Sequence, residues 1–335
     1  MEIIVPAAGL SSRFPNMRPK YLLRDYSGTL MLKRSLAPYR AYPITVGILK
    51  EHDETYHARE LITKELGDDI RVVVLDSVTN GPADTVYQIL KQANITGEFL
   101  VKDCDNFFEH EISSGNYVCV SKIADHAVLK KLASKSFVIS NDQGIVTSII
   151  EKQIVSDTFC VGGYKFESAS LFTNTFENLN LTREIFVSDV LQQCLYNQVV
   201  VTERAVTNYI DVGTADDWFE FNDKPTYFCD IDGTIIRSKD QYSTVVEPMT
   251  NNVEAMRREQ ARGCKIIFCT ARGEHERDST RQILNDLGFG ECELIMSVHH
   301  SKRILVNDYA NSNPYPTAVA INLKRDVDNL NDFIK

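Results

Sequence analysis

The sequence predicts an α/β protein of two domains, each a mostly parallel, Rossmann-like sheet flanked by helices. Apolar runs of strand length alternate with segments of helical period through both halves of the chain. The chain has 335 residues, which is long for a single domain. A short polar stretch ending in proline, Phe221 to Pro225, interrupts the alternation. We therefore predict domains over residues 1–222 and 226–335.

The elements of the first domain follow from the alternation of short apolar runs and helical periodicity. We expect strands at 2–7, 43–49, 71–76, 98–103 and 117–122, a β-rich region from 137 to 166, and strands at 198–202 and 206–211. Helices are expected at 29–40, 53–66, 82–93, 168–177, 187–195 and 215–221.

The second domain repeats the pattern on a smaller scale. Its expected strands are 226–230, 265–269, 293–296, 303–307 and 317–321. Its expected helices are 250–262, 275–287 and 326–333.

Composition excludes some classes of partner. A net charge of −10 argues against a surface that coats nucleic acid, although a local basic loop or a metal can still bind phosphorylated substrates. No apolar run approaches the ~20 residues that cross a bilayer, and the first residues lack the basic start of a signal peptide. Eight scattered cysteines without C-x-x-C are typical of reduced thiols. We expect a cytoplasmic protein with no membrane partner, and an oligomer is compatible with the sequence.

The opening stretch, "IIVPAAGLSSRFPNMRPKYLL", is a strand followed at once by small residues. A loop of this kind lets backbone N–H groups point at a phosphate without obstruction by side chains. Its candidate nucleotide-binding residues are Ala8, Gly9, Ser11 and Ser12. Arg13 and Lys20 are cations that would neutralise a triphosphate and its departing pyrophosphate. The alternative is a tight βα turn with a solvated basic rim.

Further segments follow in an order that resembles the sugar-phosphate nucleotidyltransferases. The opening matches their signature, A-A-G-x-G-[ST]-R followed by P-K-x-L, except that Ser11 replaces the second glycine. The other matching segments are "NGPADTV" with Gly81, "LVKDCDNFF" with Asp103 and Asp105, "IIEKQ" with Glu151 and Lys152, "VGGYKF" with Gly163, and "YIDVGTADDW" with Asp211. In "IIEKQ", Gln153 replaces the proline of the family's E-K-P segment.

The resemblance implies a GT-A-like domain that transfers a nucleotidyl group from an NTP to a small phosphomonoester and releases pyrophosphate. It implies that Asp105 and Asp211 hold Mg²⁺, with Asp103 as the alternative to Asp105. Such a metal offsets the repulsion between the attacking phosphate and the nucleotide. The Gly81 segment would recognise the base. CTP is favoured over UTP or dTTP, because compact members of the family often handle small phospho-alcohols with CTP.

The remaining roles are also carried over from the resemblance. Glu151, Lys152 and Gly163 would bind the acceptor, Lys20 the transferring group and Arg13 the pyrophosphate. Two of these residues have structural alternatives. Asp211 would also suit a helix N-cap ahead of 215–221, and Glu151 a solvated acid at a strand end.

The second domain opens with "YFCDIDGTI", an apolar strand that ends in Asp230 and Asp232. The carboxyl edge of a parallel sheet is where α/β proteins build their sites. One carboxylate at that edge can attack phosphorus, and the other can protonate the leaving oxygen and then activate water. Both roles require Mg²⁺ to offset charge.

This domain resembles the haloacid dehalogenase superfamily, whose phosphatases begin with D-x-D-G-T. "IIFCTAR" supplies Thr270 as the phosphate-binding hydroxyl, and "HSKRILVND" supplies a cation, Lys302 or Arg303, with Lys302 assigned as catalytic. Asp308 would complete the Mg²⁺ site with Asp230 and Asp232. The short spacings between these motifs leave no room for a large cap, so a capless domain is expected. The alternative is a non-catalytic remnant of the fold.

Together these interpretations predict a bifunctional enzyme whose products feed capsule or surface-polysaccharide assembly. A phosphatase that removed the acceptor's phosphate would starve its partner, so we expect it to act on a different phosphate. Two alternatives remain open at this point. The first domain is a non-catalytic nucleotide sensor beside an active phosphatase, or both domains are scaffolds in an assembly complex.

Overall fold

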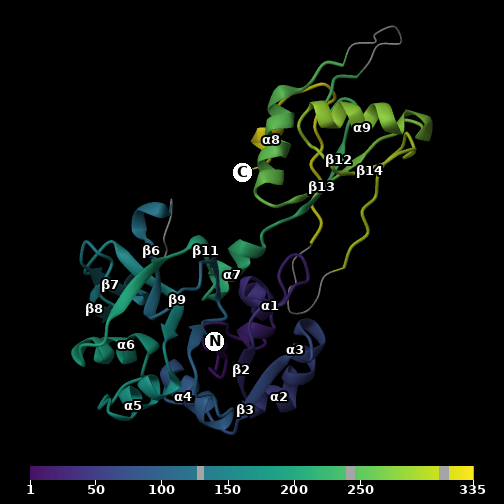
Figure 1. Cartoon of the computed structure of the whole chain (residues 1–335). Coiled ribbons are helices and arrows are strands. Elements are labelled where there is room, and N and C mark those ends of the chain that lie inside the picture. Colours follow the sequence, from purple (N-terminus) through teal and green to yellow (C-terminus); the bar gives the residue numbers. More distant parts are fainter. Residues whose placement is uncertain (127–131, 239–245, 309–316, 335) are drawn as a thin grey trace. The chain divides into compact units, whose positions relative to one another are not determined.

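The computed structural model describes residues 1–126, 132–238, 246–308 and 317–334. Contacts divide the chain into two compact units, Met1–Asn222 and Asp223–Lys335 (Figure 1). The predicted α/β class is confirmed, because each unit combines a largely parallel sheet with helices. Within the described ranges, no helix combines the length and the apolar character that crossing a membrane would require.

A large mixed sheet forms the centre of the first unit, in the order β10-β6-β9-β4-β1-β2-β3. Strand β1 lies parallel to β2 and β4, whereas β9 runs antiparallel between β4 and β6. A hairpin, β7–β8, pairs beside β9. The strands are β1 (Glu2–Pro6), β2 (Ile44–Leu49), β3 (Ile70–Leu75), β4 (Phe99–Lys102), β6 (Asn116–Lys122), β7 (Ser136–Ser140), β8 (Val146–Glu151), β9 (Thr158–Phe166) and β10 (Val201–Ala205).

Helices cover both faces of this sheet (Figure 1). One core packs α4 (Pro82–Gln92), α5 (Ala169–Glu177) and α6 (Val187–Tyr196) on one face. A second core packs α1 (Met31–Leu36) and α3 (Ala58–Leu66) on the other, and α2 (Lys50–Tyr56) directly precedes α3. Because both faces are buried, the central strands are almost continuously apolar, which is why the sequence predicted them well.

A separate two-stranded ladder brings two distant segments together. Strand β5 (Asn106–Glu109) pairs antiparallel with β11 (Thr207–Asp211), and this register sets Asp211 opposite Asn106. The N–H of Val212 donates to the carbonyl oxygen of Asp105 at 3.0 Å. Helix α7 (Ala215–Asn222) follows and packs Phe221 against Phe107, with ring centroids 5.3 Å apart.

The second unit has a parallel three-stranded sheet, β12-β13-β14. Its elements are β12 (Thr226–Asp230), α8 (Thr250–Ala261), β13 (Lys265–Cys269), α9 (Arg277–Asp286) and β14 (Glu293–Ile295). Ile231, Phe268 and Leu284 lie in its core and are fully buried.

The predictions for the end of the chain were wrong in part. Residues 303–307 and the described residues 317–321 form no strand, and a 3₁₀ turn at Leu330–Asp332 replaces the expected helix at 326–333. The side chains of Ile304, Val306 and Val319 are 79%, 88% and 85% exposed. An apolar run becomes a strand only where a neighbouring strand satisfies its backbone groups, and no described segment does so here.

Candidate active sites

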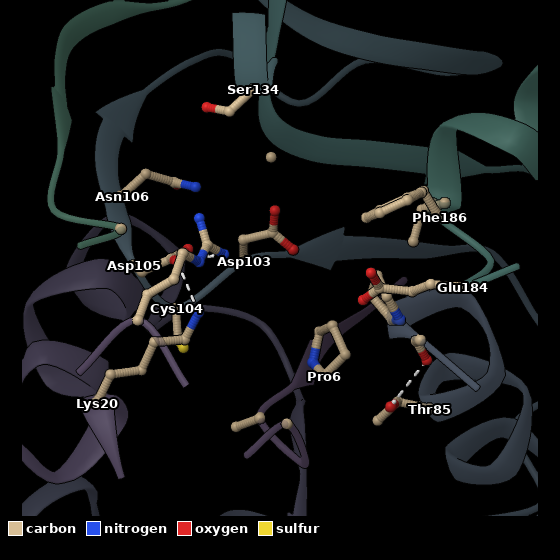
Figure 2. A pocket seen from close by; sticks show the side chains of 18 of the residues that line it. Pro6, Lys20, Thr85, Asp103, Cys104, Asp105, Asn106, Ser134, Glu184 and Phe186 are labelled. Carbon is tan, nitrogen blue, oxygen red and sulfur yellow. Dashed lines mark hydrogen bonds and ion pairs between the residues drawn. The ribbon is translucent and has the colours of Figure 1, made fainter. Parts of the chain in front are cut away.

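A cavity of about 710 Å³ opens in the first unit, beside the ends of β1 and β4 (Figure 2). Every segment that predicted a nucleotidyltransferase site contributes to its lining. Among the predicted residues the lining includes Ala8, Gly9, Ser11, Ser12, Arg13, Lys20, Gly81, Asp105, Glu151, Lys152 and Asp211. The fold therefore gathers in one cavity residues that are up to about 200 positions apart in the chain.

The small-residue loop after β1 contains one strained position. Ser11 has φ +52°, in the left-handed region that favours glycine. The resembled family has glycine here, and this backbone geometry explains that preference. The Ser11 Oγ accepts a hydrogen bond from the Lys20 N–H at 3.1 Å. Serine thus adds a contact that glycine would lack, and it ties the loop to the segment carrying Lys20.

Asp105 lies against two cations. Its Oδ2 is 2.6 Å from the Lys20 Nζ and 4.0 Å from an Arg13 guanidinium nitrogen. Burial by itself would raise the pKa of Asp105, but the charges of Lys20 and Arg13 outweigh burial and hold that pKa well below its usual range. The carboxylate is therefore ionised at neutral pH.

Asp211 also has a cationic partner. Its carboxylate forms an ion pair with Lys135, whose Nζ donates to the Tyr209 hydroxyl at 2.9 Å. The Asp211 Oδ1 accepts from the Gly213 N–H at 2.9 Å. The cap of α7 is provided instead by Thr214, because its Oγ1 accepts from the Asp217 N–H at 3.3 Å. The Asp211 carboxylate therefore does not cap α7, and it lines the cavity.

The two aspartates converge on Gly213. A methyl group added to this glycine would lie 3.0 Å from the Asp211 Oδ1 and 3.2 Å from the Asp105 Oδ2. The described residues contain no group of three or more His, Cys, Asp or Glu side chains arranged to hold a metal. Mg²⁺ characteristically takes one or two carboxylates and completes its shell with water and phosphate oxygens. The Asp105 and Asp211 pair fits that requirement.

Gly81 shapes the cavity wall at the start of α4. Its φ is +103°, and an added β-carbon would lie 2.6 Å from the carbonyl oxygen of Ile185. Both the conformation and the space therefore require glycine.

The two residues of the "EK" segment have different surroundings. The Glu151 Oε2 accepts hydrogen bonds from the hydroxyls of Ser136 and Ser188, the latter at 2.7 Å. The ammonium of Lys152 lies 4.3 Å from the centroid of the Phe186 ring. Glu151 is thus held in the cavity wall and is not a freely solvated acid.

Gly163 is the one predicted residue of this unit that does not line the cavity. It lies within β9, where an added methyl would be 2.8 Å from the Cys119 Sγ. The neighbouring Gly162 lines the cavity instead, with φ +85° and the Asp103 carboxylate only 2.5 Å from an added methyl. Strand alternation explains the difference, because successive residues face opposite sides.

Two further residues line the cavity: Lys135 had no predicted role, and Asp103 was predicted only as an alternative to Asp105. Lys135 precedes β7 in "LASKSFV", where no motif marks it. Asp103 also lines the cavity, and Figure 2 shows it across from Glu184 and Phe186. Burial, followed by the charge of Asp105, raises the pKa of Asp103 to about 6.

In the second unit, adjacent strand ends gather three of the predicted residues. Asp230 ends β12 opposite Cys269 of β13, and Thr270 follows directly. The Thr270 hydroxyl donates to the Asp232 Oδ2 at 3.3 Å. This cluster therefore follows from the parallel ladder of β12 and β13.

Arginines bind both of these carboxylates. A guanidinium nitrogen of Arg303 lies 2.9 Å from the Asp230 Oδ1, whereas Lys302 is exposed. Arg272 donates to both oxygens of Asp232, at 2.9 and 2.7 Å. Arg272 had no predicted role, although it is the last residue of the "IIFCTAR" segment.

No contact among the described residues links Asp308 to Asp230, Asp232 or Thr270. It is exposed, and its backbone carbonyl accepts from the Thr317 hydroxyl at 2.8 Å. Asp230 and Asp232 offer the hard oxygen donors that Mg²⁺ prefers and so fit the metal by type. Asp308 remains a predicted third ligand.

Comparison with known proteins supports a different relationship for each unit. The sequence model of the haloacid dehalogenase-like hydrolase family matches residues 227–329, which confirms the resemblance of the second unit. No curated protein matches the chain.

Solved structures match the first unit's share of the chain. A nucleoside-diphosphate-sugar pyrophosphorylase from Vibrio cholerae is 20% identical, with a TM-score of 0.56 over 65% of this chain and 98% of that one. The inositol-1-phosphate CTP transferase from T. maritima is 18% identical, with a TM-score of 0.55 over 64% of this chain and 90% of that one. These likenesses confirm a nucleotidyltransferase-like fold.

Proposed function

We propose that the chain is a bifunctional enzyme. The first unit transfers a nucleotidyl group from an NTP to a small phosphomonoester, a sugar phosphate or phospho-alcohol, and releases pyrophosphate. The second hydrolyses a phosphomonoester through an aspartyl-phosphate. The observation that carries the proposal is the convergence of Asp105 and Asp211 on Gly213, with Lys20 beside them in one cavity.

The transfer reaction must overcome repulsion between anions. An acceptor phosphate oxygen attacks the α-phosphorus while the bond to the pyrophosphate oxygen breaks, so negative charge accumulates on both sides. Mg²⁺ held by Asp105 and Asp211 would supply positive charge between the nucleotide and the acceptor. Lys20 stabilises the transferring group, and Arg13 stabilises the pyrophosphate at the rim of the loop.

Lys135 provides the cation for the acceptor phosphate. Its Nζ lies beside Asp211 and 2.9 Å from the Tyr209 hydroxyl, so its charge is near the metal ligands. Lys152, the candidate from the sequence motif, instead lies over the Phe186 ring. Lys152 and Glu151 then contact the organic part of the acceptor.

The nucleotide is held by the small-residue loop and the Gly81 turn, and CTP is preferred over UTP or dTTP. The sequence resemblance favours CTP, and one structure of similar fold is described as a CTP transferase. Near Gly81, the hydroxyls of Thr79 and Thr85 lie 2.6 Å apart and give the wall hydrogen-bonding groups. Such groups can recognise the polar edge of a base.

The phosphatase is placed in the second unit. Asp230 is the nucleophile, Asp232 the general acid and base, and Thr270 binds the phosphate. Asp230, Asp232 and the predicted third ligand Asp308 would hold Mg²⁺, which would offset the negative charge of the phosphate. It acts on a phosphate other than the acceptor's, in the cytoplasmic synthesis of precursors for capsule or surface polysaccharide. The family match over residues 227–329 supports the assignment of hydrolysis to the second unit.

Pyrophosphate release tests the transferase. The purified chain is incubated with Mg²⁺, each of CTP, UTP, dTTP and other NTPs, and a panel of sugar phosphates and phospho-alcohols. We expect release with at least one pair, fastest with CTP, and a loss of about 10²- to 10³-fold in Asp105→Asn. If no pair releases pyrophosphate from the wild type, the transferase is excluded.

Phosphate release tests the second unit independently. The wild type and Asp230→Asn are compared on phosphorylated metabolites at saturating Mg²⁺. We expect release from the wild type and none above background from the variant, because the nucleophile is lost. Equal release from the two proteins, or none from either, would exclude the proposed phosphatase.

A further inference from the structure

Lys102, the last residue of β4, is fully buried immediately before the turn that carries Asp105. Its Nζ lies 2.7 Å from the carbonyl oxygen of Asp103 and 2.9 Å from that of Asn106. It also lies 2.5 Å from the Asn106 Oδ1 and 2.9 Å from the Ser35 Oγ. A buried ammonium is costly to desolvate, so this one is surrounded by acceptors.

These contacts hold both ends of the turn. The carbonyl groups of Asp103 and Asn106 flank Asp105, and one ammonium binds both of them. The Ser35 hydroxyl, from α1, also donates to the Asp103 carbonyl at 3.0 Å. Removing the ammonium would leave the Asn106 carbonyl and side chain to find new partners in a buried place.

We propose that Lys102 is a positioning residue that fixes the Asp103–Asn106 turn, and with it the metal-binding orientation of Asp105. The inference rests on the proposed function of the first unit. Lys102 does not itself line the cavity, so it acts through the backbone of the turn. It therefore sets how well Asp105 binds the cation, with little effect on the nucleotide's own contacts.

A second buried lysine provides a matched control. Lys165 lies on β9 with 1% exposure, and its Nζ is 2.7 Å from the Glu98 Oε2. Neither Lys165 nor Glu98 lines the cavity. Replacing either lysine with methionine removes a buried ammonium of the same size, but only one replacement releases the Asp105 turn.

The experiment compares Lys102→Met with Lys165→Met in the full chain. The Mg²⁺ concentration for half-maximal pyrophosphate release is measured with the NTP KM and the melting temperature. We expect both variants to melt at lower temperature, and Lys102→Met alone to need ~10-fold more Mg²⁺. The NTP KM at saturating Mg²⁺ should stay within about twofold of wild type. Equal Mg²⁺ requirements in the two variants would overturn the proposal.

A milder variant keeps the test usable if Lys102→Met does not fold. Ser35→Ala removes one hydroxyl that bonds both to Lys102 and to the Asp103 carbonyl. It should shift the Mg²⁺ requirement in the same direction by about two- to threefold, less than in Lys102→Met, because the ammonium keeps its bonds to the Asp103 and Asn106 carbonyls. An unchanged Mg²⁺ requirement in Ser35→Ala would contradict the positioning role of Lys102.

Direct binding of Mn²⁺ alone, followed by electron paramagnetic resonance, separates this inference from the proposed function. If the wild type turns over no nucleotide, the proposed function fails, yet weaker Mn²⁺ binding in Lys102→Met than in Lys165→Met still supports the positioning role. Asp105→Asn gives the signal expected when the site is lost. Equal binding in the two methionine variants, or no binding by the wild type, overturns the positioning role.

Discussion

The two units place their candidate residues by different means. In the first unit, β5 and β11 form a ladder that sets Asp211 beside the segment following Asp105. In the second unit, the β12–β13 ladder brings Asp230 and Thr270 together, but Lys302 and Asp308 lie on an irregular, exposed segment. Residues at the ends of paired strands are therefore gathered, whereas on the irregular segment Arg303 reaches Asp230 and no described contact brings Lys302 or Asp308 there.

The difference also appears in the counter-charges. Asp105 and Asp211 each contact a lysine that is at most 22% exposed, so their ion pairs are shielded from water. Asp230 contacts Arg303, which is 49% exposed on the irregular segment. A solvent-exposed ion pair of this kind contributes little to stability. The Asp230 pair is thus held less firmly than the pairs of the first site, whereas Asp232 keeps a shielded partner in Arg272, which is 11% exposed.

Among the lysines of the first unit, the acceptor cation Lys135 gives the largest expected effect. Lys135→Met should lower kcat/KM for the acceptor by about 10- to 100-fold, because it removes a charge-assisted hydrogen bond to the phosphate. Lys152→Met, which removes the motif lysine over the Phe186 ring, should cost less than about fivefold. Steady-state kinetics with the productive acceptor measure both. A larger loss of kcat/KM in Lys152→Met than in Lys135→Met would show that Lys152 binds the acceptor phosphate.

Two neighbouring cations, Lys302 and Arg303, can be compared in the same way in the second unit. Arg303→Ala should lower phosphatase kcat/KM by about tenfold, since Arg303 alone of the two cations contacts Asp230 in the structure. Lys302→Ala should change it by less than about twofold, as for an exposed charge. Phosphate release at several substrate concentrations gives the two values. The reverse ranking would show that the 302–308 segment adopts another arrangement when the substrate is bound.

The smallest effect is expected at Ser11. Glycine would relieve a left-handed backbone that costs about 1 kcal/mol and would lose the bond from Ser11 to the Lys20 N–H, which is worth a similar amount. Ser11→Gly should therefore change the free energy of unfolding by less than about 1 kcal/mol and the NTP KM by less than about threefold. Denaturant unfolding and kinetics test this, with Ser12→Gly as the control. A large loss of NTP binding would make the Ser11 hydroxyl a ligand of the nucleotide.

Much of the fold could be predicted because buried parallel strands are continuous apolar runs. Strand β5 was missed because "NFFE" directly follows the "DCD" segment, and nothing in it marks a separate pairing. The same limit explains the wrong strand at 303–307, since the sequence shows an apolar run but not whether a neighbour covers it.

The candidate site residues also divide into those that a sequence motif marks and those that only tertiary contacts bring to the site. Asp105 and Asp211 were recognisable because each stands in a motif at a strand end. Lys135 was not, because only the folded chain brings it to Asp211. The sequence did not show whether Gly162 or Gly163 lines the cavity. Successive residues of β9 face opposite sides of the sheet, so an error of one residue in the register exchanges the two glycines.

A double-mutant cycle on Asp105 and Asp211 tests whether the two carboxylates hold the same cation. Pyrophosphate release is measured for Asp105→Asn, Asp211→Asn and the double variant at saturating Mg²⁺, with melting temperatures as the check on folding. If the two carboxylates hold one cation, the double variant should be at most about threefold slower than the slower single variant. Losses that multiply fully, so that each aspartate acts alone, would contradict it.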